Sequence, residues 1–214
     1  MSLQGELRVV DDVPRAFADL LVEEAPPSLM LSGGSTARRC YELLAGVDVD
    51  WGGVDVFFGD ERWVPVDDPD SNEGQARRAF LEQVGPRAIH SMRNAGEVPD
   101  SAADAYDRLL RAHGPLDFVH LGLGPDGHTA SLFPGSPALD ERARLVVATG
   151  DDDHPHPRLT VTFPALNQSR LAVFTVAGEE KREALGRVRS GDDLPAALVS
   201  AARVVWLVDE AANA

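Results

Sequence analysis

The chain has 214 residues, of which 43% are hydrophobic and 26% charged, so it can bury a core without a disulfide or a structural metal. Its formal net charge of −15 opposes binding to nucleic acids and to anionic membrane surfaces, and we expect neither as a partner. Cys40 is the only cysteine, which excludes an internal disulfide and favours the cytoplasm. No apolar run approaches the roughly 18 residues of a membrane span, and residues 1–6 do not resemble a secretory signal.

Short apolar segments recur along the chain and predict β-strands. They are continuous rather than alternating, which is typical of strands that are covered on both faces. We expect strands over residues 7–10, 28–31, 54–58, 118–123, 145–148, 159–163, 171–176 and 204–208.

Segments with helical periodicity lie between most of these strands. The first begins after Asp11 or Asp12, which serves as its N-cap, and has Pro14 in its first turn. The alternation of strands and helices predicts an α/β fold with a doubly wound, mostly parallel, Rossmann-like sheet, formed as one domain over residues 1–214. We expect further helices over residues 37–44, 73–84, 100–113 and 179–189.

A polar segment follows each of four predicted strands. In an open parallel sheet, ligands bind beyond the carboxyl ends of the strands. We therefore expect these segments to meet at one edge of the sheet. They are residues 32–36, 59–62, 124–128 and 177–181.

The first of them, the glycine-rich loop of residues 32–36 (Ser-Gly-Gly-Ser-Thr), has the composition of an anion site. Glycines let a ligand approach the backbone, and the helix that follows presents free N–H groups and the positive end of its dipole. The alternative is an ordinary turn between a strand and a helix with a serine cap.

His128 is the candidate general base, because it follows a predicted strand and has Asp126 two residues before it to orient its ring. The alternative is a loop histidine beside a turn-forming Asp-Gly pair. The glycines of residues 122–128 do not predict a dinucleotide site. Compared with the Gly-x-Gly-x-x-Gly motif, the third glycine comes one position too early, and Pro125 removes an N–H donor.

Other charged groups lie at the same predicted edge. Lys181 is the only lysine, and it falls in the first turn of a predicted helix, where a nearby anion would offset its repulsion by the helix dipole. Arg158 begins a predicted strand, and Asp60, Glu61 and Arg62 follow another. Each also has an ordinary interpretation, as a solvated cation or as a surface ion pair.

The remaining histidines and the cysteine carry weaker signals. His154 and His156 lie beside three aspartates, but we expect a solvated loop there rather than a metal site. His120 and Cys40 fall in apolar segments and are expected to be core residues. No cysteine or histidine spacing is typical of zinc, so we expect no metal.

Several segments together resemble the 6-phosphogluconolactonases, within the wider family that includes the glucosamine-6-phosphate deaminases. The Asp-Gly-His-Thr-Ala-Ser-Leu-Phe-Pro run is the most specific of them, and all occur in the same order over about residues 28–190. They are Leu-Ser-Gly-Gly-Ser-Thr at 31–36, Gly-Asp-Glu-Arg at 59–62, Asp-Ser-Asn at 70–72, Gly-Leu-Gly-Pro-Asp-Gly-His-Thr-Ala-Ser-Leu-Phe-Pro at 122–134 and Gly-Glu-Glu-Lys at 178–181.

The resemblance implies a parallel sheet flanked by helices and the hydrolysis of 6-phospho-D-glucono-1,5-lactone to 6-phosphogluconate in the pentose phosphate pathway, without a cofactor. It implies that His128 is the general base, with Asp126 beside it. The implied phosphate and substrate contacts are Gly33, Gly34, Ser35, Thr36, Asp60, Arg62, Arg158 and Lys181.

Two alternatives belong to other functional classes. A glucosamine-6-phosphate deaminase needs a glutamate shortly after the Asp-Gly-His segment, where this chain has Ser-Leu-Phe-Pro at 131–134. A non-catalytic sugar-phosphate-binding module of the sensor type usually carries an additional DNA-binding part. This chain is too short for such a part, and its negative charge opposes DNA binding. The sequence leaves open whether the protein is a monomer or a small homo-oligomer.

Overall fold

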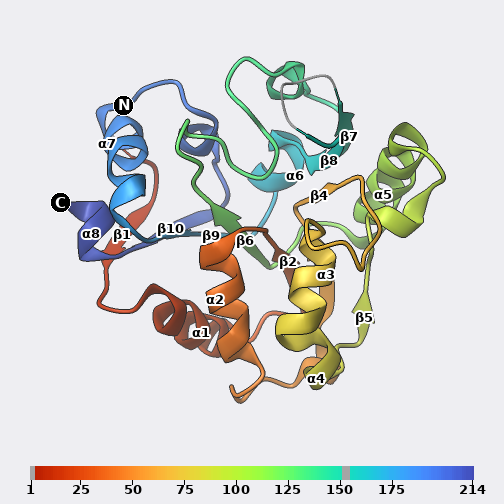
Figure 1. Ribbon diagram of the computed structural model, residues 1–214, viewed down its shortest axis with the longest axis horizontal. Helices are drawn as coiled ribbons and strands as arrows, with labels where there is room; N and C mark the ends of the chain where they lie inside the picture. The colour runs from red at the N-terminus through yellow and green to blue at the C-terminus, as the bar shows by residue number, and fades with distance from the viewer. Residues whose placement is uncertain (1–2, 151–154) are drawn as a thin grey trace.

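The structure is a computed structural model that describes residues 3–150 and 155–214. Its centre is a seven-stranded sheet in which every neighbouring pair of strands is parallel (Figure 1). The predicted mostly parallel α/β sheet is therefore confirmed. In spatial order the strands are β1 (Glu6–Val9), β10 (Arg203–Val208), β9 (Leu171–Val176), β6 (Phe118–Gly122), β2 (Ser28–Leu31), β3 (Asp55–Phe58) and β5 (Ala88–Ile89).

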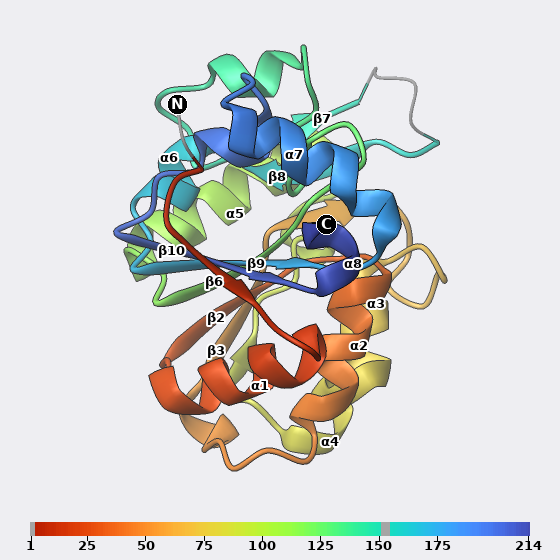
Figure 2. The same ribbon diagram turned by 90° about the vertical axis from the view of Figure 1, so that its left-hand side faces the viewer.

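Helices cover both faces of this sheet (Figure 2). On one face lie α1 (Val13–Glu24) and α2 (Ser35–Leu44), and on the other lie α5 (Pro99–His113), α6 (Phe163–Asn167) and α7 (Arg182–Ser190). None of the helices in the described part of the chain is long and apolar enough to cross a membrane. The shorter helices are α3 (Asn72–Ala76), α4 (Glu82–Val84) and α8 (Glu210–Asn213).

A second, three-stranded antiparallel sheet was not predicted. It consists of β4 (Asp60–Arg62), β8 (Arg158–Val161) and β7 (Val146–Thr149), in that order. Two of these strands were expected from the sequence, but not their separation from the main sheet. Residues 60–62, expected only as part of a polar segment after a strand, form the third strand. The two sheets meet at Gly59, whose N–H donates to the Leu31 carbonyl of β2 while its own carbonyl accepts from the Val161 N–H of β8.

One predicted helix and one predicted strand also differ from the structure. The helix expected over residues 73–84 is divided, because a π-helical turn (Arg77–Leu81) lies between α3 and α4. The strand expected over residues 159–163 ends at Val161, because α6 begins at Phe163 with a proline in its first turn.

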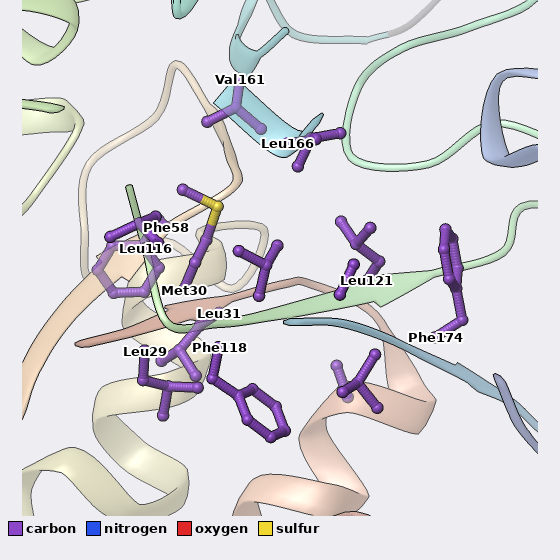
Figure 3. Close-up of a cluster of buried hydrophobic side chains, with 14 of the residues drawn as sticks. Leu29, Met30, Leu31, Phe58, Leu116, Phe118, Leu121, Val161, Leu166 and Phe174 are labelled. Carbon is purple, nitrogen blue, oxygen red and sulfur yellow. The ribbon is translucent and has the colours of Figure 1, made fainter. Parts of the chain in front are cut away.

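The core is packed against both faces of the main sheet, as the continuous apolar strands indicated. Figure 3 shows Phe118 on one side of the sheet and Val161 and Leu166 on the other, all of them buried. His120 and Cys40 are fully buried, as expected. A rigid sheet of this kind fixes the positions of the loops that leave its carboxyl edge.

Candidate active site

The loops that follow β2 and β6 leave the sheet from two neighbouring strands. From β2 the chain continues outward to β3 and β5, whereas from β6 it continues in the opposite direction to β9 and β10. This reversal is the place where doubly wound sheets form ligand clefts. A cavity of about 170 Å³ lies there, and the predicted site residues that line it are Gly33, Gly34, Asp60, Arg62, His128, Arg158 and Lys181.

Asp126 does not line this cavity but holds the imidazole that does. Its Oδ1 atom lies 2.6 Å from Nδ1 of His128 and also accepts the backbone N–H of His128 at 3.1 Å. Burial raises the pKa of Asp126, but these hydrogen bonds and the neighbouring imidazole outweigh it and leave the pKa lowered. The carboxylate thus accepts a hydrogen bond from the N–H at Nδ1 of His128. In the neutral ring this leaves Nε2 without a proton, as the basic nitrogen.

The packing around His128 explains the glycine at position 124. A Cβ atom at Gly124 would lie 2.1 Å from Nδ1 of the ring. The N–H of Gly124 also donates to the carbonyl oxygen of His128 at 2.8 Å, which closes the loop behind the imidazole. Only glycine therefore lets this loop bring the ring to the cavity.

The glycine-rich loop forms a second wall and continues into an adjoining cavity of about 170 Å³. Ser35 and Thr36 line this adjoining cavity, and Lys181 lines both. Gly34 has a φ of 99°, so the loop takes a backbone conformation that favours glycine directly before α2. The first residues of α2 line the adjoining cavity, and the N–H groups at the start of a helix have no partner within the helix.

Asp60 does not form the surface ion pair that was the alternative interpretation. It is 5% exposed, and among the described residues its carboxylate accepts hydrogen bonds from the Ser131 hydroxyl at 2.7 Å and the Asn72 amide at 3.1 Å. The Asn72 amide in turn explains Gly33, because a Cβ there would lie 2.0 Å from the Asn72 oxygen. The cavity wall is thus built from three distant segments.

Glu61 is a structural carboxylate that the sequence did not distinguish from a surface group. It is 1% exposed and accepts the Ser71 hydroxyl and the backbone N–H groups of Arg62, Asn72 and Glu73. Burial raises the pKa of Glu61, although each of these hydrogen bonds acts to lower it. By accepting the N–H groups at the start of α3, the Glu61 carboxylate holds that helix against β4.

Arg62 and Arg158 lie directly opposite each other on the antiparallel strands β4 and β8. Arg62 donates to the Asp70 carbonyl at 2.6 Å, and the Arg158 guanidinium lies 5.5 Å from the ring centre of Phe133. Two cations at directly opposed positions repel each other, and a nearby negative charge reduces the cost of this repulsion. Both guanidinium-bearing residues line the cavity, which gives this part of its wall a positive charge.

Some lining residues were not among the predicted site residues. Ser32, Asn72 and Ala130 face the cavity, and Ala130 has a φ of 50°, which is rare for a residue other than glycine. The sequence around Ala130 carries no signal of this conformation. It is produced by a tight local turn in which the Leu132 N–H donates to the Thr129 carbonyl.

His156, in the loop before β8, is not among the residues that line the cavity. His156 lies 3.2 Å from a carboxylate oxygen of Asp70, and His154 lies outside the described residues. Within the described ranges, no group of three or more His, Cys, Asp or Glu residues is arranged to hold a metal ion. The absence of a metal from the reaction stays a prediction.

The fold and the cavity define a class of α/β protein in which an imidazole and several cationic side chains surround one cleft. The model of the family "Glucosamine-6-phosphate isomerases/6-phosphogluconolactonase" matches residues 6–206. A 6-phosphogluconolactonase of Synechocystis sp. is 41% identical over 208 residues, which are 90% of this chain and 86% of the relative. The protein of the same name from Mycobacterium tuberculosis is 39% identical over 207 residues, which are 87% of this chain and 83% of the relative.

A solved structure gives the same result. The crystal structure of a 6-phosphogluconolactonase from Shewanella baltica superposes with a TM-score of 0.86 at 29% sequence identity, and covers 96% of this chain and 97% of that one. The chain therefore belongs to the glucosamine-6-phosphate isomerase/6-phosphogluconolactonase family.

Proposed function

We propose that this protein is a 6-phosphogluconolactonase, which hydrolyses 6-phospho-D-glucono-1,5-lactone to 6-phosphogluconate in the pentose phosphate pathway. The observation that carries the proposal is that His128, Arg62, Arg158 and Lys181 line one cavity. The names of the relatives that align over most of the chain support the same activity.

In the proposed reaction, Nε2 of His128 takes a proton from a water molecule as the water oxygen attacks the lactone carbonyl carbon. A new C–O bond forms, and the carbonyl electron pair moves to oxygen, which gives a tetrahedral oxyanion. When this collapses, the bond to the ring oxygen breaks, and that oxygen takes the proton back from His128 to become a hydroxyl. Asp126 stabilises the imidazolium between the two proton transfers.

The oxyanion needs a donor or a positive charge close to the carbonyl oxygen. Arg62 lines the same cavity as His128, and the backbone N–H groups of the glycine-rich loop are the other candidates. We propose that one of these donors supplies the stabilisation.

Phosphate recognition is assigned to the cationic side chains and the glycine-rich loop of the same cleft. We propose that Lys181 and Arg158, together with Gly33, Gly34, Ser35 and Thr36, bind the 6-phosphate, and that Asp60 and Arg62 contact the sugar edge. Lys181 and the glycine-rich loop line the two adjoining cavities. Binding energy from the phosphate would orient the lactone carbon at His128.

The family also contains deaminases that act on glucosamine 6-phosphate, so that reaction is the second candidate. The segment after His128 where a deaminase needs a glutamate is Ser-Leu-Phe-Pro at 131–134, without an acid, and the Ser131 hydroxyl donates a hydrogen bond to Asp60. This arrangement favours the lactonase. We further propose that the enzyme acts in the cytoplasm as a single-domain monomer or small homo-oligomer, without cofactor, nucleic acid or membrane partner.

A direct test compares the two reactions. The purified protein is assayed with freshly generated 6-phosphogluconolactone, using 6-phosphogluconate dehydrogenase to detect the product, and with glucosamine 6-phosphate, using ammonia release. We expect lactone hydrolysis well above the spontaneous rate and no ammonia. Ammonia release without lactone hydrolysis would identify a deaminase, and the absence of both would identify a non-catalytic binding protein.

A further inference from the structure

A buried chain of hydrogen bonds connects the glycine-rich loop to β9 through the interior. The Ser32 N–H donates to the Tyr41 hydroxyl oxygen at 2.7 Å, and that hydroxyl lies 2.8 Å from Nδ1 of His120. On the other side of the ring, Nε2 lies 2.8 Å from the Thr175 hydroxyl. All four residues are buried, and the reaction described above does not use Tyr41, His120 or Thr175.

The distances and basicities show which group donates and which accepts in each of these hydrogen bonds. The Tyr41 O–H has two acceptors in reach, Nδ1 of His120 at 2.8 Å and the Ser32 carbonyl at 3.1 Å, and the imidazole nitrogen is both nearer and more basic. Burial lowers the pKa of His120 to about 3, so the ring is neutral and has one N–H. With Nδ1 accepting from Tyr41, that N–H is on Nε2 and donates to Thr175.

The consequence is that the Thr175 oxygen is used as an acceptor and its O–H is available to donate. Cys40 lies against the same hydroxyl, and burial raises the pKa of its thiol to about 12, so it stays an uncharged S–H, a weak acceptor. A phosphate oxygen is a far stronger acceptor than a thiol.

Thr175 is also in the right place. It lines the cavity that adjoins the imidazole site, where the other lining residues include Ser35, Thr36, Lys181 and one carboxylate, Glu180. It lies near the carboxyl end of β9, beside Gly122 of β6, and α2 begins next to this strand (Figure 1). A group bound between Lys181 and the first turn of α2 therefore has Thr175 in the wall of its cavity.

We propose that Thr175 is an uncharged phosphate-binding residue, and that Tyr41 and His120 are positioning residues that turn its hydroxyl proton toward the phosphate. This proposal rests on the proposed function, because it names a further contact for the phosphorylated substrate.

The test replaces Thr175 by valine, which keeps the branched shape and removes the hydroxyl. The measured quantity is the ratio of kcat/KM for 6-phosphogluconolactone to kcat/KM for unphosphorylated glucono-1,5-lactone. Because a hydrogen bond to a charged group is lost only with the phosphorylated substrate, Thr175→Val should lower this ratio about tenfold or more. The dissociation constant of inorganic phosphate, measured by calorimetry, should rise similarly, and Thr175→Ser should restore both values.

Thr162→Val is the matched control. Thr162 is equally buried, but its hydroxyl donates to the Arg144 carbonyl, so its loss should affect stability without changing the substrate ratio. Thr175→Val with an unchanged ratio and unchanged phosphate affinity would overturn the proposal. So would an equal loss with both lactones and unchanged phosphate affinity, which is the result of a purely structural role.

The two proposals fail in different ways. If the wild-type protein does not hydrolyse the phosphorylated lactone, the proposed function fails, and the phosphate titration of Thr175→Val still tests the binding role of Thr175. The proton direction is tested separately by long-range ¹H–¹⁵N spectra of the histidine rings, with the His120 signals assigned by their loss in His120→Gln. We expect the Nε2–H tautomer, whereas the Nδ1–H tautomer would contradict the assignment.

Discussion

The ring of His128 is held between Asp126 and Phe133: its Nδ1 lies 2.6 Å from the Asp126 carboxylate, and its centre lies 4.5 Å from that of the Phe133 ring. The carboxylate fixes which nitrogen carries the proton, and the aromatic ring limits rotation of the imidazole. The unprotonated Nε2 is thereby held in a fixed orientation before any substrate binds. This geometry leads to the first of four predictions.

Replacing His128 by asparagine removes the proposed base while keeping a small polar side chain. We expect kcat for 6-phosphogluconolactone to fall by about 10²–10⁴, the usual contribution of general base catalysis. Binding of 6-phosphogluconate, measured by calorimetry, should change little, because the phosphate groups of the site are intact. A variant that hydrolyses the lactone at the wild-type rate would show that another group activates the water.

Lys181 and Arg182 are adjacent cations with different surroundings, which makes them a matched pair. Lys181 lines both cavities, whereas Arg182 pairs with Glu179 at 3.4 Å and bonds to the Ala211 carbonyl. Lys181→Gln should raise KM for the phosphorylated lactone about tenfold or more, since a charge-assisted hydrogen bond to phosphate is lost. Arg182→Gln should leave KM near the wild-type value, and equal effects of the two changes would indicate only a general effect of charge.

Gly124 and Gly186 offer a comparison of two alanine substitutions. A methyl group at Gly124 would collide with the His128 ring, so Gly124→Ala should displace the imidazole and lower kcat at least about tenfold, because general base catalysis depends on the position of the base. At Gly186, in the helix α7, nothing lies within 4 Å of the added methyl. Gly186→Ala should therefore stabilise the protein by about 0.5–1 kcal/mol in thermal or chemical unfolding, with unchanged activity. A fully active Gly124→Ala enzyme would contradict the proposal that catalysis depends on the position of the His128 imidazole.

The strands β2, β6 and β9 were predictable because each is a continuous apolar run, and the polar segments after them followed from the rule for parallel sheets. Asp60 and Glu61 show where such reasoning ends. In the sequence they resemble surface residues, because their burial depends on partners in other elements: Glu61 accepts from residues at the start of α3, and Asp60 accepts from Ser131, 71 residues away. No local pattern encodes that pairing.

The antiparallel sheet was missed for a related physical reason. β4 has three residues, all of them polar, so it carries no hydrophobic period, and it exists because β8 supplies its hydrogen-bond partners from about a hundred residues away. This same pairing places Arg62 opposite Arg158. The part of the site least visible in the sequence is thus the part that depends on long-range strand pairing.

The buried imidazole of His120 makes stability depend on pH. Its pKa is lowered to about 3 by burial, whereas in the unfolded chain a histidine binds a proton near pH 6.5. Between these values the unfolded state binds more protons than the folded state, so stability is full above about pH 6.5 and decreases as the pH falls. From pH 7 to pH 5 this one residue should remove about 2 kcal/mol from the free energy of unfolding.

The comparison that isolates His120 is His120→Gln, whose amide can accept from Tyr41 and donate to Thr175 without titrating. The carboxylates with lowered pKa, such as Glu24 and Asp55, lose their contributions at lower pH, and His90, whose pKa burial also lowers, is present in both proteins. Urea unfolding at pH 7 and pH 5 should therefore show a smaller decrease in the variant, by about 2 kcal/mol. Equal decreases in the two proteins would mean that His120 takes up its proton in the folded state at ordinary pH.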